Sequence, residues 1–209
     1  MMRLMFISVF GLLLFSANTC KKESEENHRE EIAGLRVEKD SLFKDPATTP
    51  IPEAERSSFK RLNYFPLDSA FFVKAKFEIL PQPEVVNIAY TNGGTEAYTR
   101  YARLDFKLKG EKQSLFAYRS NDFLSSKEYR NAVFIPFMDP SNGRETYGGG
   151  RFLDVEIPED EEMMLDFNLA YNPYCAYNAE YTCPIPPREN LLGVPVLAGE
   201  KNYNSDKAN

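Results

Sequence analysis

Residues 101–109, YARLDFKLK, and residues 70–80, AFFVKAKFEIL, decide the fold class of this chain. In the first stretch every second residue from Ala102 to Leu108 is apolar, and the residues between them are charged. The second stretch repeats this period of two. Because the side chains of a strand point alternately to opposite faces, this period is typical of antiparallel strands with one buried and one solvated face.

Further short strands are expected around these two. Residues 84–91 precede Asn92, Gly93 and Gly94, which suit a tight hairpin turn because they adopt positive φ readily. The remaining predicted strands are 113–119, 132–138, 152–157, 164–169 and 194–198. Closely spaced strands without helices between them favour a mainly β fold of about eight or nine strands, an antiparallel β-sandwich or small barrel.

One proline interrupts the most apolar of these strands. Residues 132–138 form a continuous apolar run that suits the centre of a sheet, but Pro136 has no N–H to donate to a neighbour. We therefore expect a bulge or a strand end at Pro136.

The first part of the chain has a different pattern. Between residues 25 and 44 apolar side chains recur at helical spacing among charges, which predicts an N-terminal amphipathic helix. Three prolines between residues 45 and 55 end this periodicity and predict a linker. We expect one folded domain, a β-domain over residues 59–209.

Residues 1–19 have the organisation of a signal peptide. A basic start at Arg3 is followed by an apolar run from Leu4 to Phe15 and by small or polar residues before Cys20. The apolar run is too short to span a bilayer as a helix. The segment is therefore expected to be removed from the mature protein.

A cysteine in this position resembles the lipobox of bacterial lipoproteins, in which the thiol is acylated and the signal is cut just before it. Ala17 and Thr19 stand where lipoboxes usually carry Leu and Gly or Ala. We expect lipidation of Cys20, which makes residues 20–58 a lipid-anchored stalk, helix and Pro-rich linker. The expected location is the bacterial cell envelope, at its periplasmic face or the cell surface, with the membrane as a partner through the N-terminal lipid.

Residues 21–31, KKESEENHREE, resemble the segment of a Lys followed by acidic residues that comes after the lipidated cysteine in many Bacteroidetes lipoproteins, where it can act as a surface-export signal. The alternative is a solvated stalk.

Charge and histidine content exclude several functional classes. The formal net charge is −6, which argues against nucleic acid as a partner. The one histidine, His28, lies in the stalk, so Ser-His-Asp, Cys-His and HExxH chemistry have no histidine in the β-domain. We expect neither a metal site nor a cofactor.

Three blocks near the C-terminus carry the densest motifs. They are FMDPSNGRETYGGGRFL at 137–153, LDFNLAYNPYCAYNAEYTCPIPPREN at 165–190 and AGEK at 198–201. In this order they closely resemble the domain of unknown function family numbered 1684, over roughly residues 29–202. The resemblance implies a family without an established activity, so it assigns no role to any residue.

The candidate ligand-binding residues are polar or aromatic and lie in these blocks. They are Asp139, Asn142, Glu145, Tyr147, Arg151, Asp166, Asn168, Tyr171, Asn172, Glu189, Asn190 and Glu200.

Two of these residues, Arg151 and Asp166, have alternative interpretations. Arg151 follows three glycines and suits bidentate binding of a carboxylate or phosphate, or it braces the loop by pairing with Glu145 or Asp166. Asp166 and Asn168 share one strand face, so Asp166 is a general-base or ligand-orienting candidate if it lies beside Arg151, and ordinary surface if it faces water.

The remaining cysteines form an even pair once Cys20 is lipidated. In an oxidising compartment a disulfide between Cys175 and Cys183 is the default expectation. A zinc site and a reactive thiol are weaker alternatives, because the spacing is unusual for zinc and no histidine stands nearby.

Three functions remain open. The first is an envelope lipoprotein whose β-domain binds a small polar or carbohydrate-like ligand, or an envelope protein, through the Gly-rich and Tyr/Asn loops. The second is a hydrolase that uses paired carboxylates without histidine. The third is a purely structural lipoprotein.

Overall fold

The computed structural model describes residues 13–120 and 130–203, with side chains from Glu25 onward. The chain divides into two compact units, residues 1–41 and residues 42–209. Residues 1–12 of the predicted signal peptide and the side chain of Cys20 lie outside the described part. In the residues searched, no helix is both long enough and apolar enough to cross a membrane.

The helix α1 spans Leu13–Lys44 and confirms the predicted N-terminal helix, which begins earlier than the periodicity indicated. A short helix, α2, follows at Glu53–Arg56. The segment between them belongs to the second unit, where Phe43 and Ile51 pack in a cluster with Leu62 and Tyr177. The Pro-rich segment is thus part of the packed structure.

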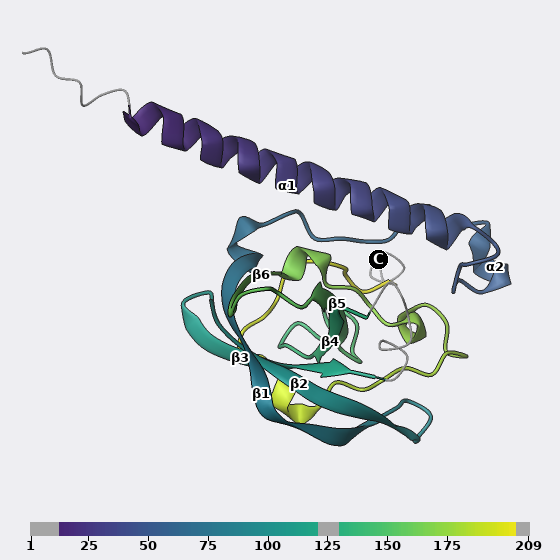
Figure 1. Ribbon diagram of the computed structural model, residues 1–209. Helices are drawn as coiled ribbons and strands as arrows, with labels where there is room; N and C mark the ends of the chain where they lie inside the picture. The colour runs from purple at the N-terminus through teal and green to yellow at the C-terminus, as the bar shows by residue number, and fades with distance from the viewer. Residues whose placement is uncertain (1–12, 121–129, 204–209) are drawn as a thin grey trace, which may run out of the picture. The chain divides into compact units, whose positions relative to one another are not determined.

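The second unit is built on one six-stranded antiparallel sheet that curls into a half-barrel (Figure 1). The strand order is β5-β4-β3-β2-β1-β6. The strands are β1 (Phe72–Ala89), β2 (Thr95–Leu108), β3 (Glu111–Arg119), β4 (Ala132–Phe137), β5 (Arg151–Glu156) and β6 (Glu162–Asp166). The prediction of a mainly β, antiparallel fold with an N-terminal helix is confirmed.

Two predicted strands are one in the structure. Most of residues 70–80 and of residues 84–91 belongs to β1, and the pairing of β1 with β2 shifts register between Ile79 and Glu84. The bulge takes the place of the expected break. The predicted hairpin turn at Asn92–Gly94 is confirmed, with Gly93 at φ 84°.

The predicted strand 194–198 is not a strand. Its side chains alternate as expected, with Val194, Val196 and Ala198 buried and Leu197 41% exposed. However, no ladder pairs this segment with another strand among the described residues. The strand expected at 164–169 also stops early, at Asp166, and continues as a 3-10 turn over Phe167–Leu169.

Strand alternation divides the apolar residues between the two faces of the sheet. Leu115 and Ala117 of β3 belong to the main core, which the segment 192–198 fills from the inner face. Phe116 and Tyr118 point the other way and join a second cluster that also contains Ile88, Tyr98, Phe134 and Phe152. The outer face of the sheet is therefore aromatic toward the end of β3.

Candidate functional site

Arg151 is completely buried at the start of β5 and holds the C-terminal segment in place. Its guanidinium donates to the carbonyls of Val196 (2.7 Å), Ala198 and Glu200 (3.1 Å). It also pairs with the Asp139 carboxylate at 3.1 Å. Burial lowers the pKa of Arg151, and Asp139 opposes that shift. Arg151 thus supplies donors that a neighbouring strand would otherwise supply to residues 196–200.

Asp139 completes this arrangement from the loop after β4. One carboxylate oxygen accepts from the Val196 N–H (3.0 Å) and the Ser141 N–H (2.8 Å), and the other binds Arg151. Of the two partners expected for Arg151, neither Glu145 nor Asp166 forms an ion pair with it in the described structure. Arg151 thus braces the loop, and its acidic partner is Asp139.

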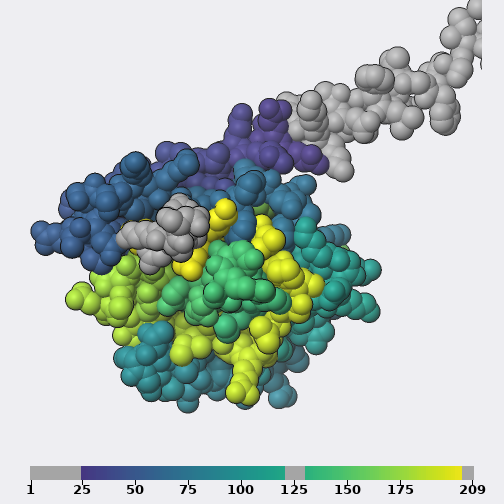
Figure 2. Space-filling view, turned by 180° about the vertical axis from the view of Figure 1, so that it is seen from behind, coloured from purple at the N-terminus to yellow at the C-terminus, as the bar shows by residue number. Residues whose placement is uncertain are grey.

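The Gly-rich loop 139–150 is stabilised by its own hydrogen bonds. The Asn142 side chain accepts from the Asp139 N–H (2.7 Å) and donates to Thr146 Oγ1 and the Tyr147 carbonyl, both at 3.0 Å. At Gly150, φ is 88° and a Cβ would lie 2.7 Å from the carbonyl oxygen of Phe137, so a side chain cannot be accommodated. In Figure 2 this loop, in green, lies between the yellow-green residues around 175 and the yellow C-terminal segment.

Two candidates of this loop lie nearer its surface. Glu145 is exposed, and its backbone carbonyl accepts from the Asn202 N–H at 2.9 Å. The Tyr147 ring covers Gly149, where a Cβ would lie 2.5 Å from the ring, and partial burial raises the pKa of Tyr147. The absence of a side chain at Gly149 therefore allows the Tyr147 ring to pack directly on the backbone.

Glu200 and Asn172 extend the buried network of Arg151, which binds the Glu200 backbone carbonyl. The Glu200 carboxylate accepts from the Asn172 N–H at 2.9 Å and from the hydroxyl of Tyr177. The Asn172 side chain donates to the Lys201 carbonyl at 2.8 Å. Burial, reinforced by Glu200, raises the pKa of Tyr177 well above its usual value.

Asp166 and Asn168 are both buried and bind one another. Asp166 accepts from the backbone N–H and the side-chain amide of Asn168, both at 2.8 Å. The Asn168 side chain in turn bonds the backbone N–H and carbonyl of Asp68, both at 3.0 Å. Asp166 therefore caps a turn that binds the chain segment before β1. It neither pairs with Arg151 nor faces water, which were the two positions expected for it.

The Asn190 side chain bridges the backbones of β3 and β4 near Pro136. Its amide oxygen accepts from the Phe116 N–H (2.7 Å), and its amide nitrogen donates to the carbonyls of Phe116 (2.8 Å) and Pro136 (2.7 Å). The ladder between β3 and β4 has one registered pair, Tyr118 with Phe134. The bulge or strand end expected at Pro136 is not found, because β4 continues to Phe137 and pairs with β5 through Pro136. The pairing with β3 is interrupted instead, and there the inserted side chain of Asn190 satisfies the backbone.

Glu189 leads to a different part of the molecule, on the outer face of the sheet. Its carboxylate accepts from the Arg100 guanidinium (2.6 Å) and from the Tyr118 hydroxyl (3.1 Å). The other arm of Arg100 reaches Glu84 at 3.1 Å.

The same pattern of a tyrosine donating to a carboxylate recurs twice nearby. Tyr171 donates to Asp154 at 2.6 Å, and Tyr90 donates to Glu96 while its oxygen lies 2.8 Å from that of Tyr98. We refer to these side chains together as the aromatic–carboxylate face: Glu84, Tyr90, Glu96, Tyr98, Arg100, Phe116, Tyr118, Asp154, Tyr171 and Glu189.

The surroundings shift the pKa values of three side chains of this face, Glu189, Tyr90 and Tyr118. Burial alone raises the pKa of Glu189, but hydrogen bonds from the backbone and Tyr118 and the charge of Arg100 outweigh it and lower the pKa. Burial raises the pKa values of Tyr90 and Tyr118, and their carboxylate partners raise them further. A lowered pKa is the opposite of what a general acid requires, so Glu189 does not suit the acid role in a two-carboxylate hydrolase.

Most of this face was missed by sequence reasoning, which singled out only Tyr171 and Glu189. A signal was present in β2, where Glu96, Tyr98 and Arg100 occupy every second position of TEAYTRY. That period puts three functional groups on one strand face. What the sequence did not reveal is the register shift between Arg100 and Ala102, which exchanges the faces midway along β2.

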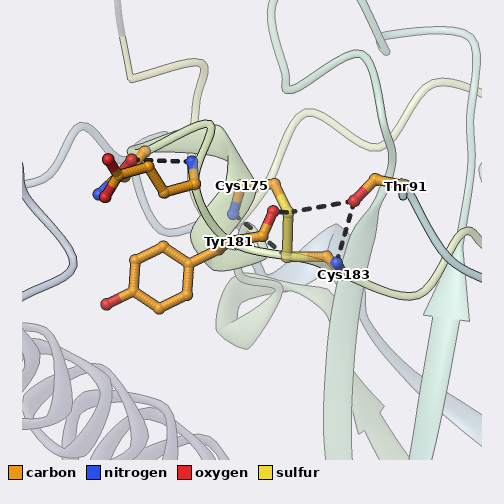
Figure 3. Close-up of a disulfide and its surroundings, with 6 residues drawn as sticks. Thr91, Cys175, Tyr181 and Cys183 are labelled. Carbon is orange, nitrogen blue, oxygen red and sulfur yellow. Dashed lines mark hydrogen bonds between the residues drawn. A yellow bond between two sulfur atoms is a disulfide. The ribbon is translucent and has the colours of Figure 1, made fainter.

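The disulfide between Cys175 and Cys183 is present, as expected (Figure 3). It closes a loop beside the β1–β2 hairpin, where the Thr91 hydroxyl accepts from the Cys183 N–H at 3.1 Å and lies 3.7 Å from Cys175 Sγ. The loop carries Tyr181 next to Tyr174, with ring centroids 5.2 Å apart. In the described residues, no three His, Cys, Asp or Glu side chains are grouped so as to hold a metal ion.

The candidate residues therefore fall into separate groups. Asp139, Arg151, Asn172 and Glu200 are joined in one buried network, Asp166 and Asn168 in a second, and Glu189 lies on the aromatic–carboxylate face. The buried groups hold backbone in place, and the outer face presents functional groups that remain partly exposed.

Comparisons with known proteins identify a family and a solved structure of similar fold. An uncharacterised protein of Haloarcula marismortui, solved by solution NMR, is 36% identical, with a TM-score of 0.67, and the match covers 86% of this chain and 96% of that one. No curated protein sequence matches the chain. The model of the family described as protein of unknown function, DUF1684, matches residues 57–201. The chain belongs to the DUF1684 family of proteins of unknown function.

Proposed function

We propose that this protein is an envelope lipoprotein, anchored through Cys20, whose β-domain binds a small polar, carbohydrate-like ligand on the aromatic–carboxylate face. The observation that carries the binding proposal is the repeated pairing of a tyrosine hydroxyl with a carboxylate, in Tyr90–Glu96, Tyr118–Glu189 and Tyr171–Asp154. The Gly-rich loop, which the sequence suggested as a binding site, instead holds the C-terminal segment through Asp139 and Arg151.

The chemistry of the face suits a ligand rich in hydroxyl or amine groups. An ionised carboxylate accepts up to about four hydrogen bonds, so Glu96 and Glu189 have capacity beyond their tyrosine partners. The tyrosines hold each carboxylate in one orientation, which lowers the entropy lost on binding. The rings of Tyr90, Phe116 and Tyr171 are half-buried and offer stacking area at the rim of the buried aromatic cluster.

The charge of the face indicates which ligands it favours. Four carboxylates, those of Glu84, Glu96, Asp154 and Glu189, surround the one guanidinium of Arg100. Neutral sugars and amino sugars fit this balance, whereas anionic ligands would be repelled. Glucosamine should therefore bind more tightly than glucose, and glucuronate least of the three.

Saturation-transfer NMR with glucose, glucosamine and glucuronate tests the binding site. We expect transfer from aromatic protons to glucosamine. The variant Glu96→Gln/Glu189→Gln loses two charged acceptors, so its affinity for glucosamine should be about ten-fold lower. The matched control is Glu159→Gln/Glu180→Gln, which removes the same charge from exposed positions. Transfer that is absent for all three sugars, or that is equal in the two double variants, would overturn the proposal.

The anchor is tested separately by mass spectrometry of the mature N-terminus. We expect a chain that starts at Cys20 and carries the mass of its acyl groups. The variant Cys20→Ser should lose that mass and move from the membrane fraction to the soluble fraction. A mature chain with an unmodified Cys20 would remove the anchor from the proposal and leave the binding face untouched.

A further inference from the structure

A second charged feature lies at the other end of the sheet's outer face. An open hollow of about 750 Å³ covers the start of β1, the end of β2 and the start of β3. We call it the basic hollow, lined by Val73, Lys74, Arg103, Asp105, Phe106, Lys107, Lys112 and Gln113. Its lining holds four cationic side chains and one carboxylate, in a chain whose formal net charge is −6.

Strand register aligns three of these cations. Lys107 of β2 lies directly opposite Lys112 of β3. On the other side, the pairing of Ala75 with Phe106 places Lys74 of β1 beside Lys107. Neighbouring strands lie about 4.8 Å apart, so the row spans about 10 Å. Like charges on opposed strand positions destabilise a sheet, so the row does not serve the stability of the fold.

Carboxylates near the hollow neutralise only part of its charge. Lys74 pairs with Glu162 at 2.6 Å, and Arg103 pairs with Asp105 on its own strand. In the part of the chain that the structure describes, no ion pair joins Lys107 or Lys112 to an acid. An excess of positive charge therefore remains at the centre of the row.

We propose that the basic hollow binds the phosphate headgroups of an anionic lipid bilayer. The Lys ammonium is a compact point charge on a long, flexible stem and suits phosphate without demanding one geometry. The side chain of Lys74 is 64% exposed, and the hollow is open, which favours an extended anionic surface over an enclosed small molecule. Neither sugar binding on the aromatic–carboxylate face nor lipidation of Cys20 is needed for this step.

Vesicle co-sedimentation of the full chain tests the proposal. Binding is compared between vesicles of phosphatidylcholine alone and vesicles that also contain phosphatidylglycerol. Because an acyl anchor inserts into both kinds of vesicle, the difference between them isolates the attraction to anionic headgroups. A parallel titration with inorganic pyrophosphate measures binding of phosphate free in solution.

The test variant is Lys107→Gln/Lys112→Gln, and the control is Lys60→Gln/Arg61→Gln, which removes the same charge from exposed positions outside the hollow. Each lysine near an anionic surface contributes about a factor of five in affinity. Removing two lysines should therefore reduce the gain in affinity that phosphatidylglycerol brings by about twenty-five-fold. The control should keep it, and the increment should fall with salt. Equal increments in both variants would overturn the proposal, and so would binding of pyrophosphate without any increment on anionic vesicles.

Discussion

The guanidinium of Arg151 lies 3.1 Å from the carboxylate of Asp139, and neither side chain is exposed to solvent. Around this pair Arg151 donates to three carbonyls of residues 196–200, and Asp139 accepts from the Val196 N–H. A buried ion pair is tolerated when hydrogen bonds satisfy its remaining polar groups. Here those hydrogen bonds replace a strand, so the pair joins the C-terminal segment to the sheet.

Replacing Arg151 by Met should therefore destabilise the protein by about 3–5 kcal/mol, because Asp139 is left as a buried, unpaired charge and three carbonyls lose their donors. Urea unfolding followed by circular dichroism measures the loss. Arg188→Met, at an exposed position, is the matched control and should change the free energy of unfolding by less than about 0.5 kcal/mol. Equal stability of the two variants would contradict the bracing role of Arg151.

Asn190→Ala should cost at least about 2 kcal/mol, because the backbone N–H and carbonyl of Phe116 and the carbonyl of Pro136 lose their partner between β3 and β4. Hydrogen exchange gives a local readout, in which the Phe116 amide should exchange faster. Asn87→Ala, on the exposed side of β1, is the control. An unchanged exchange rate at Phe116 would show that the amide of Asn190 does not protect the sheet.

Removal of the disulfide in Cys175→Ser/Cys183→Ser should lower the free energy of unfolding by about 2.5 kcal/mol, the value expected from chain entropy for a loop of this length. Thermal unfolding with and without reductant measures the effect. Reductant should lower the Tm of the unmodified protein and leave the double variant unchanged. Free thiols at both positions in the denatured, unreduced protein would contradict the bridge.

Alkaline pH should destabilise the fold through Tyr177. The folded protein raises the pKa of this buried hydroxyl, so the stabilisation is complete below the unfolded value of about 10 and is lost as pH rises above it. Absorbance at 295 nm should show Tyr177 ionising only as the protein unfolds. Tyr177→Phe should flatten the fall in stability above about pH 10, whereas Tyr181→Phe, at a residue that is 38% exposed, should not. Identical alkaline profiles would contradict this assignment.

The sequence by itself determined the local features of the fold. The period of two in β1 and β2 and the turn at Asn92–Gly94 were evident, because strand alternation and turn chemistry depend on neighbours in the chain. The three motif blocks also carried the resemblance to the DUF1684 family, whose model matches residues 57–201.

Only the tertiary structure decided what the polar residues do. Arg151 and Asp139 are 12 positions apart, and the carbonyls that Arg151 binds lie more than 40 positions further on. Spacing along the chain does not show such contacts. The same holds for the aromatic–carboxylate face, since Glu189 meets Arg100 across 89 positions. Two register shifts also determine which side chains share the outer face, and a bulge leaves no clear signal in the alternation of a single strand.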